Sequence, residues 1–211
     1  MVKAWVWKAF IIGFGLAGVV INAWADIPPL DNSFATTAAT EPASVFSLPN
    51  GEGDSLAACY AFGGERLDAT ITVFVRDGND DPVYLYPAED IWLADECCLV
   101  ICPAGTIADR PTDADGVTTI SGPFLAGGST QEDVGGAMVL INGDALNQPA
   151  FVITFNSADI DGDLAVNITD VVYFVDDYLV EYRYRSDFHW DGVINLSDLV
   201  LLAEGLGAYC P

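Results

Sequence analysis

The chain has 211 residues, in which 31 aspartates and glutamates face seven lysines and arginines, so its net charge is −24. Nucleic acids are bound through clustered Lys and Arg, and anionic membrane surfaces attract the same residues, so this charge excludes the first kind of partner and disfavours the second. It suits a protein whose carboxylates are neutralised by cations.

The first 25 residues have the pattern of a secretory signal peptide. Two lysines precede an apolar run at residues 9–21, and residues 23–25 form a small-x-small tripeptide of the kind that signal peptidase accepts. The apolar run is shorter than the roughly 20 residues that span a bilayer. We therefore expect cleavage after Ala25 and a protein that is secreted, extracellular or on the cell surface, with no membrane segment afterwards. Cleavage leaves five arginines and no lysine, a net charge of −26.

Five cysteines follow the signal segment: Cys59, Cys97, Cys98, Cys102 and Cys210. In an oxidising compartment an odd count predicts at most two internal disulfides with one thiol left over, or a bridge to another chain. Cys97 and Cys98 are adjacent, and such pairs are strained, so we expect them to reach different partners. Cys210 could bond to another chain or to any of the other four.

Residues 26–64 allow three interpretations. The stretch up to Gly53 is rich in Ala, Thr, Ser and Pro. It could form first strands, a flexible leader, or a strand that pairs with a neighbouring molecule.

A series of short strands is predicted from residue 65 to residue 156. From Leu67 to Arg76 apolar and other side chains alternate, which is typical of a strand with one buried face. Other β-leaning runs lie between turns rich in Gly, Pro, Asp and Asn, and no helical period separates them, which indicates a β-sandwich. These runs are residues 83–86, 90–94, 116–122, 137–143 and 150–155.

Three stretches of this region carry a family resemblance. They read VRDGNDDPV at 75–83, DIWL at 90–93 and TDADGVTTISG at 112–122. They are similar to the turns that bracket the sheet in bacterial immunoglobulin-like domains of the invasin type. The resemblance implies an immunoglobulin-like sandwich over residues 65–156 and suggests a scaffold or adhesive role, although a fold alone does not establish a function.

Two acidic phrases with one spacing follow: DIDGDLAVNITD at 159–170 and DFHWDGVINLSD at 187–198. Calcium takes six to eight hard oxygen ligands, and alternate residues of a tight loop plus a carboxylate on the next helix can wrap one ion. We therefore expect a calcium site at positions one, three, five, seven, nine and twelve of each phrase, with the backbone carbonyl acting at position seven. The expected ligands are Asp159, Asp161, Asp163, Ala165, Asn167 and Asp170 in the first loop, and Asp187, His189, Asp191, Val193, Asn195 and Asp198 in the second.

Each loop runs into a helical pattern. Apolar residues recur at 168, 171, 172, 175 and 179 and again at 196, 199, 200, 203 and 206, which predicts two amphipathic helices. Val166 and Ile194, at position eight of each loop, are expected to pair the loops through a short β contact.

The duplicated loop and helix at residues 157–208 resemble the type I dockerin module, whose phrase is similar to D-x-N-x-D-G-x-V-N-x-x-D. The resemblance implies an EF-hand-like pair of calcium loops in a C-terminal unit at 157–211, so the expected fold class is mainly β with an α-helical end. Two residues depart from the phrase. Leu164 stands where glycine is expected, at a position that usually has positive φ, and His189 replaces an oxygen ligand with a poor ligand for calcium.

No catalytic constellation stands out. His189 is the only histidine and lies inside a predicted calcium loop, so a Ser-His-Asp or Cys-His arrangement has no independent base. The remaining candidates are carboxylate pairs, such as Asp90 with Glu89 or Asp95. We therefore predict that the protein is not an enzyme.

Three non-catalytic functions remain open. The chain could be a calcium-stabilised structural subunit that assembles with copies of itself into a fibre or surface assembly. It could instead dock to a cohesin-like protein on a cell-surface complex, or bind polysaccharide through Trp92 with Tyr84 or Tyr86. Only residues 156–158 separate the last predicted strand from the first acidic loop, whereas a docking module usually hangs on a longer linker. We therefore expect one rigid body and favour the first function.

Overall fold

The structure is a computed structural model that describes residues 30–95, 98–103, 105–130 and 136–211. The expected signal peptide and Cys97 lie outside the described residues. Within the described residues, no helix combines the length and the apolar character that crossing a membrane requires.

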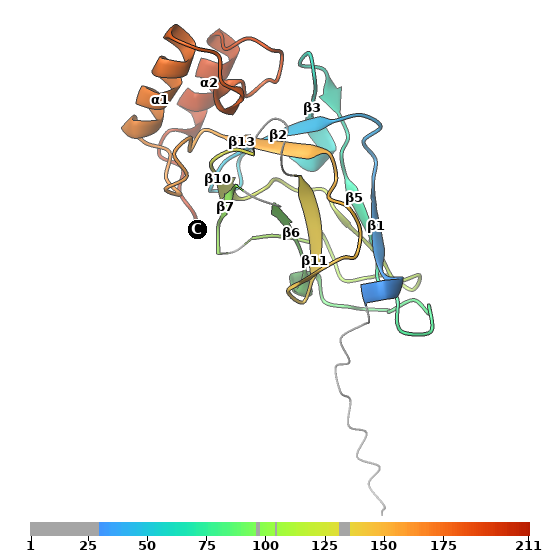
Figure 1. The fold of residues 1–211 in the computed structure, drawn as a ribbon. Coiled ribbons are helices and arrows are strands. Elements are labelled where there is room, and N and C mark those ends of the chain that lie inside the picture. The colour runs from blue at the N-terminus through green and yellow to red at the C-terminus, as the bar shows by residue number, and fades with distance from the viewer. Residues whose placement is uncertain (1–29, 96–97, 104, 131–135) are drawn as a thin grey trace, which may run out of the picture.

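The chain folds mainly as β-sheet and ends in two α-helices, as the sequence predicts (Figure 1). The helices are α1 (Ile168–Leu179) and α2 (Leu196–Gly205). The strands are β1 (Phe34–Thr37), β2 (Ala43–Ser47), β3 (Cys59–Ala61), β4 (Arg66–Leu67), β5 (Ile71–Phe74), β6 (Ile91–Asp95), β7 (Val100–Ile101), β8 (Thr106–Ile107), β9 (Val117–Ile120), β10 (Ala126–Gly127), β11 (Ala137–Ile141), β12 (Asp144–Ala145) and β13 (Ile153–Ser157).

The strands form sheets in the orders β1-β5-β9, β10-β7, β12-β11-β6-β8 and β13-β2-β3-β4. Strands β2 and β13 run parallel, from the Ala43–Ile153 pair to the Ser47–Ser157 pair, whereas the other neighbours are antiparallel. The segment at 34–47 therefore supplies first strands to the β unit. It is not a free leader, and its strands are paired within their own chain.

A single hydrophobic core joins these sheets. Ala69, Ile71, Val73 and Val75 are fully buried, as the alternation around β5 predicts. Buried residues of β1, β2, β6, β9, β10, β11 and β13 belong to the same cluster, so the sheets close around one interior.

The strand expected at residues 83–86 is absent, and a turn takes its place. Leu85 has φ 58°, in the left-handed region that ends a strand. The Thr112 hydroxyl holds this turn, because it donates to the Val83 carbonyl at 2.6 Å and accepts from the Tyr86 N–H at 2.8 Å. The apolar sequence of residues 83–86 predicts a strand and does not reveal that Thr112 will hold these residues in a turn.

The C-terminal unit packs directly on the β unit, above the ends of β2 and β13 (Figure 1). Strand β13 ends at Ser157, and a second hydrophobic cluster begins at once. It unites Phe46 and Leu48 of the β unit with Ala158, Ile160, Val166, Phe174, Phe188, Ile194, Leu202 and Ala208. The two units thus share an interior.

Each helix turns a different face inward than the apolar pattern suggests. The buried residues are Asp170, Phe174 and Asp177 on α1 and Asp198, Leu202 and Gly205 on α2. The position-twelve aspartates, Asp170 and Asp198, point back into their loops, and this orientation fixes the rotation of each helix. Much of the predicted apolar stripe is consequently exposed.

A disulfide bond joins Cys102 to Cys210, with the Cα atoms 5.6 Å apart. It ties the segment after β7 to the residues after α2, so Cys210 is not available to another chain. Cys98 is also disulfide-bonded. Cys59 is a free cysteine, and its burial raises the pKa of its thiol to about 11.

Candidate metal centre

The first loop gathers three carboxylates. Asp159, Asp161 and Asp170 each offer an oxygen, and these oxygens lie within 4.8 Å of one another. Asp159 and Asp170 are fully buried, whereas Asp161 is exposed. The cluster forms because the end of β13, the loop and the first turn of α1 meet at one point.

The Asp159 carboxylate organises the loop from within. Its Oδ1 accepts hydrogen bonds from the N–H groups of Gly162 and Asp163, at 3.0 and 3.1 Å, and its Oδ2 accepts one from Leu164 at 2.8 Å. A carboxylate at position one thereby fixes the tight turn that would surround an ion.

Asp170 closes the loop from the other side. Its Oδ1 accepts from the N–H groups of Ile160, at 2.7 Å, and Asp161, at 3.2 Å. Its Oδ2 accepts from the Asn167 N–H at 2.7 Å, which completes a capping box at the start of α1.

The turn at position six is strained as predicted. Leu164 has φ 71°, a conformation that leucine rarely adopts. Gly162, at position four, has φ 73°. In the second loop the order is reversed, because Trp190 takes φ 51° at position four and Gly192 takes φ 86° at position six. Both loops therefore have the same backbone shape, with glycine at only one of the two special positions.

The β unit forms part of the wall around the first loop. A β-carbon added at Gly127, in β10, would overlap the Asp159 carboxylate, and the Gly128 N–H donates to the Asp159 carbonyl at 2.6 Å. The methyl group of Val100, in β7, lies 3.4 Å from the β-carbon position of Gly162. The β7–β10 pair thus seats the loop, a contact for which the sequence offers no signal.

The second loop repeats the carboxylate scaffold. Asp187 accepts from the N–H groups of Asp191, at 3.2 Å, and Gly192, at 2.8 Å. Asp198 accepts from the N–H groups of His189, at 3.0 Å, and Asn195, at 2.9 Å. Asp187 and Asp198 are fully buried, as their counterparts are in the first loop.

Position three distinguishes the second loop. His189 Nδ1 lies 3.7 Å from Asp198 Oδ1, and its ring packs 5.1 Å from the ring of Tyr60. Tyr182 also donates its hydroxyl proton to Asp187 Oδ2 at 2.9 Å. Within the described residues, the three-carboxylate cluster occurs in the first loop and has no counterpart in the second.

The remaining predicted ligands line both loops in the same way. Asn167 and Asn195 are helix N-caps, and each side chain accepts from the second N–H of its helix. Their amide groups donate to the carbonyls of Ala165 and Val193, at 2.9 and 3.1 Å. Asp163 and Asp191, at position five, are exposed and accept from the N–H groups of Ala165 and Val193.

The expected β contact between Val166 and Ile194 is wrong. Val166 donates its N–H to the Ala208 carbonyl at 2.8 Å and accepts from the Gly207 N–H at 2.9 Å. The chain after α2 therefore returns to the first loop and takes the partners that the second loop was expected to provide.

Burial disfavours the ionised form of carboxyl groups in both loops. Burial raises the pKa of Asp159 to about 6, and the nearby charges of Asp170 and Asp163 add to the effect against opposing hydrogen bonds. Burial also raises the pKa of Asp170 and of Asp187. Among the described residues, the ion pairs involve neither Asp159 nor Asp170.

A buried ion pair ties α1 to the second loop. Arg185 donates to both carboxylate oxygens of Asp177, at 2.7 and 2.9 Å, and Ser186 donates to one of them at 2.7 Å. The Asp177 side chain is fully buried. This two-point contact fixes the segment that leads from α1 into the second loop.

Asp90 and Asp95, one of the two candidate pairs of catalytic acids, lie far apart. Asp90 precedes β6 and Asp95 ends it, so about five residues of extended chain, on the order of 16 Å, separate their positions. Asp95 accepts hydrogen bonds from the N–H groups of Cys98 and Leu99.

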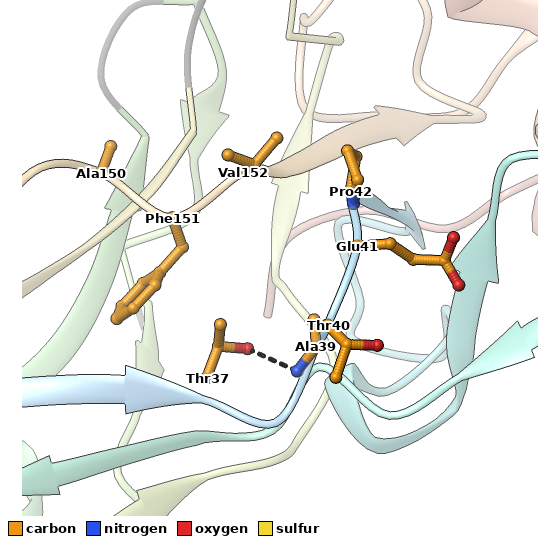
Figure 2. Close-up of a pocket in the computed structure, with 8 residues that line it drawn as sticks. All are labelled: Thr37, Ala39, Thr40, Glu41, Pro42, Ala150, Phe151 and Val152. Carbon is orange, nitrogen blue, oxygen red and sulfur yellow. Dashed lines mark hydrogen bonds between the residues drawn. The ribbon is translucent and has the colours of Figure 1, made fainter.

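The β unit has two surface hollows that lie outside the acidic loops. One, of about 370 Å³, lies beside the β1–β2 connection, where Phe151 and Glu41 point in different directions (Figure 2). Its eight lining residues include one carboxylate. The other, of about 450 Å³, is lined by half-buried Trp92 with Glu89, Ile101, Cys102, Pro103, Gly105 and Ile107.

Comparisons with known proteins add little. No protein-family model matches the chain, and no curated protein matches it. Among solved structures, the crystal structure of the Lin-41 filamin domain is similar, with 15% identity over 63% of this chain and 97% of that chain and a TM-score of 0.29. At this TM-score the similarity supports no argument about fold or function.

Proposed function

We propose that this chain is a secreted, non-catalytic structural protein whose β unit is an immunoglobulin-like sandwich and whose C-terminal unit binds calcium in dockerin-like loops. Calcium would fix the helix pair on the β unit, and the rigid body so formed would assemble with copies of itself. The observation that carries this proposal is the carboxylate scaffold, built twice on the same backbone, with Asp159, Asp161 and Asp170 converging in the first copy.

The donor set of the first loop fits calcium. Carboxylates and a backbone carbonyl are hard oxygen ligands, which calcium prefers to nitrogen or sulfur. Two buried carboxylates in close proximity repel one another in a medium of low dielectric constant, and a divalent cation removes this cost. The second loop has the same shape but offers His189 at position three, so the proposal assigns it a weaker site.

The loops lie between the β unit and the helices, which supports a structural role for the ion. The first loop contacts β7 and β10, and Asn156 of β13 donates to the carbonyl of Asp187, in the second loop, at 2.6 Å. An ion that orders either loop would therefore also order this junction.

Docking to a cohesin-like protein is the second candidate. The exposed apolar residues of α1 and α2 favour it, since a partner could cover them. Against it stands the tight junction between β13 and the first loop, which leaves the C-terminal unit no freedom of its own.

Thermal unfolding tests the proposal. Millimolar calcium should raise the melting temperature of the secreted chain above its value in excess chelator, because a hundredfold excess over Kd adds about 2.7 kcal/mol to the free energy of unfolding. Asp161→Asn should reduce this shift, whereas Asp115→Asn, at an exposed turn of the β unit, should not. Equal melting temperatures in calcium and in chelator would show that the loops bind no calcium.

A further inference from the structure

Helices α1 and α2 each carry a regularly spaced apolar stripe on an exposed face. The intervals are four, three and four residues on α1, and three, four and three on α2, which is the spacing of a helix that packs along another helix. The stripes are Ile168, Val172, Val175 and Leu179, and Leu196, Leu199, Ala203 and Leu206. The exposed fractions of Ile168, Leu179 and Leu196 reach 73%, 70% and 70%.

The two stripes meet in one groove. Val175 and Leu179 from α1 and Leu196 and Leu199 from α2 line a hollow of about 270 Å³, together with Phe174, Tyr178 and Asn195. The helices lie side by side at the end of the molecule remote from β1 and the lower end of β11 (Figure 1). The stripes therefore form a single helix-pair face, with ridges and a groove between them.

We propose that two copies of this chain associate through the helix-pair face, each copy packing α1 and α2 against those of the other. Apolar residues at this spacing pack well against another helix. A second copy of the chain supplies such helices, because α1 and α2 are the α-helices of the described residues. A two-fold axis would bring the face against itself, so that the ridges of one copy enter the groove of the other in a four-helix arrangement.

The size of the face matches what a dimer requires. Nine of its apolar side chains are at least 41% exposed: Ile168, Val172, Val175, Tyr178, Leu179, Leu196, Leu199, Val200 and Leu206. Burying each would remove roughly 60–120 Å² from water. The total is comparable with the roughly 800 Å² per partner of a standard interface.

None of these nine residues is charged, although the same helices carry two exposed acids, Asp176 and Glu204. Repulsion between acids elsewhere is screened beyond about 8 Å at physiological ionic strength. The inference rests on the proposed function in one respect, since each bound calcium ion would also remove two negative charges from each copy. The sequence also suggested that a leader strand could pair with a neighbouring molecule. Residues 34–47 are not free to do so, because β1 and β2 are paired within the chain.

Light scattering coupled to size-exclusion chromatography, in calcium, tests the proposal on the secreted chain and two matched variants. Val172→Glu places a charge on the helix-pair face, and Val152→Glu places one on the β unit, at residues that are 63% and 64% exposed. We expect a dimer for the wild type and for Val152→Glu, and a dimer at least tenfold weaker for Val172→Glu. Circular dichroism should show that both variants remain folded, since both side chains are exposed.

A wild type that is monomeric up to its solubility limit overturns the proposal, and so does a monomer that binds an added cohesin module. A Val172→Glu dimer as tight as the wild-type dimer shows that copies meet elsewhere and also overturns it. Melting of the same samples with calcium and with chelator separates the two proposals. If calcium does not raise the melting temperature, the proposed calcium-binding function is refuted. The mass measured by light scattering then still tests whether two copies associate through the helix-pair face.

Discussion

Gly127 lies against the carboxylate of Asp159, so closely that a β-carbon at this position would overlap Oδ2. One residue belongs to the β7–β10 sheet and the other opens the first acidic loop. The site is therefore completed by a strand some thirty residues earlier in the sequence, and the loop depends on the β unit for its shape.

Gly127→Ala should consequently destabilise the protein and weaken its response to calcium. The added methyl group must displace Asp159 or β10, and overpacking of this kind costs about 1–3 kcal/mol. Denaturant unfolding with and without calcium measures both effects. Gly122→Ala is the control, because nothing lies within 4 Å of its β-carbon position. Equal losses in the two variants would mean that Gly127 has no special role.

The two loops should differ in calcium affinity. His189→Asn should tighten the second site, because the amide oxygen supplies a hard ligand where imidazole supplies a poor one. Asp161→Ala should weaken the first site more than His189→Ala weakens the second. Isothermal calorimetry of the wild type and these variants measures both affinities. Two identical sites, indifferent to the residue at 189, would contradict this expectation.

Calcium binding should strengthen as the pH rises through about 6. The pKa of Asp159 is raised to about 6 from its usual value, so this group stabilises the metal-free fold at low pH. That stability is lost as the pH rises through the folded pKa, where the buried carboxyl ionises and calcium replaces the proton. The calcium-induced shift in melting temperature should therefore be larger at about pH 7.5 than at about pH 5.

Replacing Asp159 with Asn should flatten this pH dependence, and Asp115→Asn should leave it unchanged. A calcium shift of the same size at both pH values in the wild type would show that Asp159 does not compete for protons at the site.

Removing the charge of Arg185 should destabilise the fold. Arg185→Met leaves the buried carboxylate of Asp177 without its two-point partner, at a cost of roughly 2–4 kcal/mol, somewhat reduced because Arg185 is 29% exposed and Arg183 still lies 3.6 Å from Asp177 Oδ1. Adding Asp177→Asn should recover part of the loss, since the buried charge is then gone. Urea unfolding measures each step, with Arg110→Met, on the exposed surface, as the control. No recovery in the double variant would count against this account.

Opening the Cys102–Cys210 disulfide should lower stability by about 2–4 kcal/mol. The bond closes a long loop, with a separation of 108 residues, and so restricts the unfolded chain. The double variant Cys102→Ser, Cys210→Ser should melt at a lower temperature yet remain monomeric under denaturing, non-reducing electrophoresis. A disulfide-linked dimer that forms in the wild type and is lost in the double variant would show that Cys102 or Cys210 pairs between chains.

The sequence predicted the structural features that depend on residues close together in the chain. The strand at Ile71–Phe74 follows from alternation, and the two helices that begin at Ile168 and Leu196 follow from the apolar spacing after each acidic loop. The strained φ of Leu164 also followed from its position in a repeated phrase.

The predictions that were wrong concern residues whose partners lie far away in the sequence. The turn at Leu85 is held by Thr112, and Val166 pairs with residues 207 and 208, which carry no β pattern. The apolar spacing also gave the wrong inward faces for the helices, although the expected ligand roles of Asp170 and Asp198 agree with their buried position. Tyr60 and Tyr182, which contact the second loop, have no marking in the sequence.

The parallel pairing of β2 with β13 governs when this chain can fold. Roughly 110 residues separate Ala43 from its partner Ile153, so one side of β2 has no hydrogen-bonding partner until nearly the whole β unit has been synthesised. Pairings at such a distance form slowly, and an open strand edge invites aggregation while it waits. A chain that ends before residue 153 would therefore lack β13, whose Ile153 and Phe155 belong to the hydrophobic core, and could not complete that core.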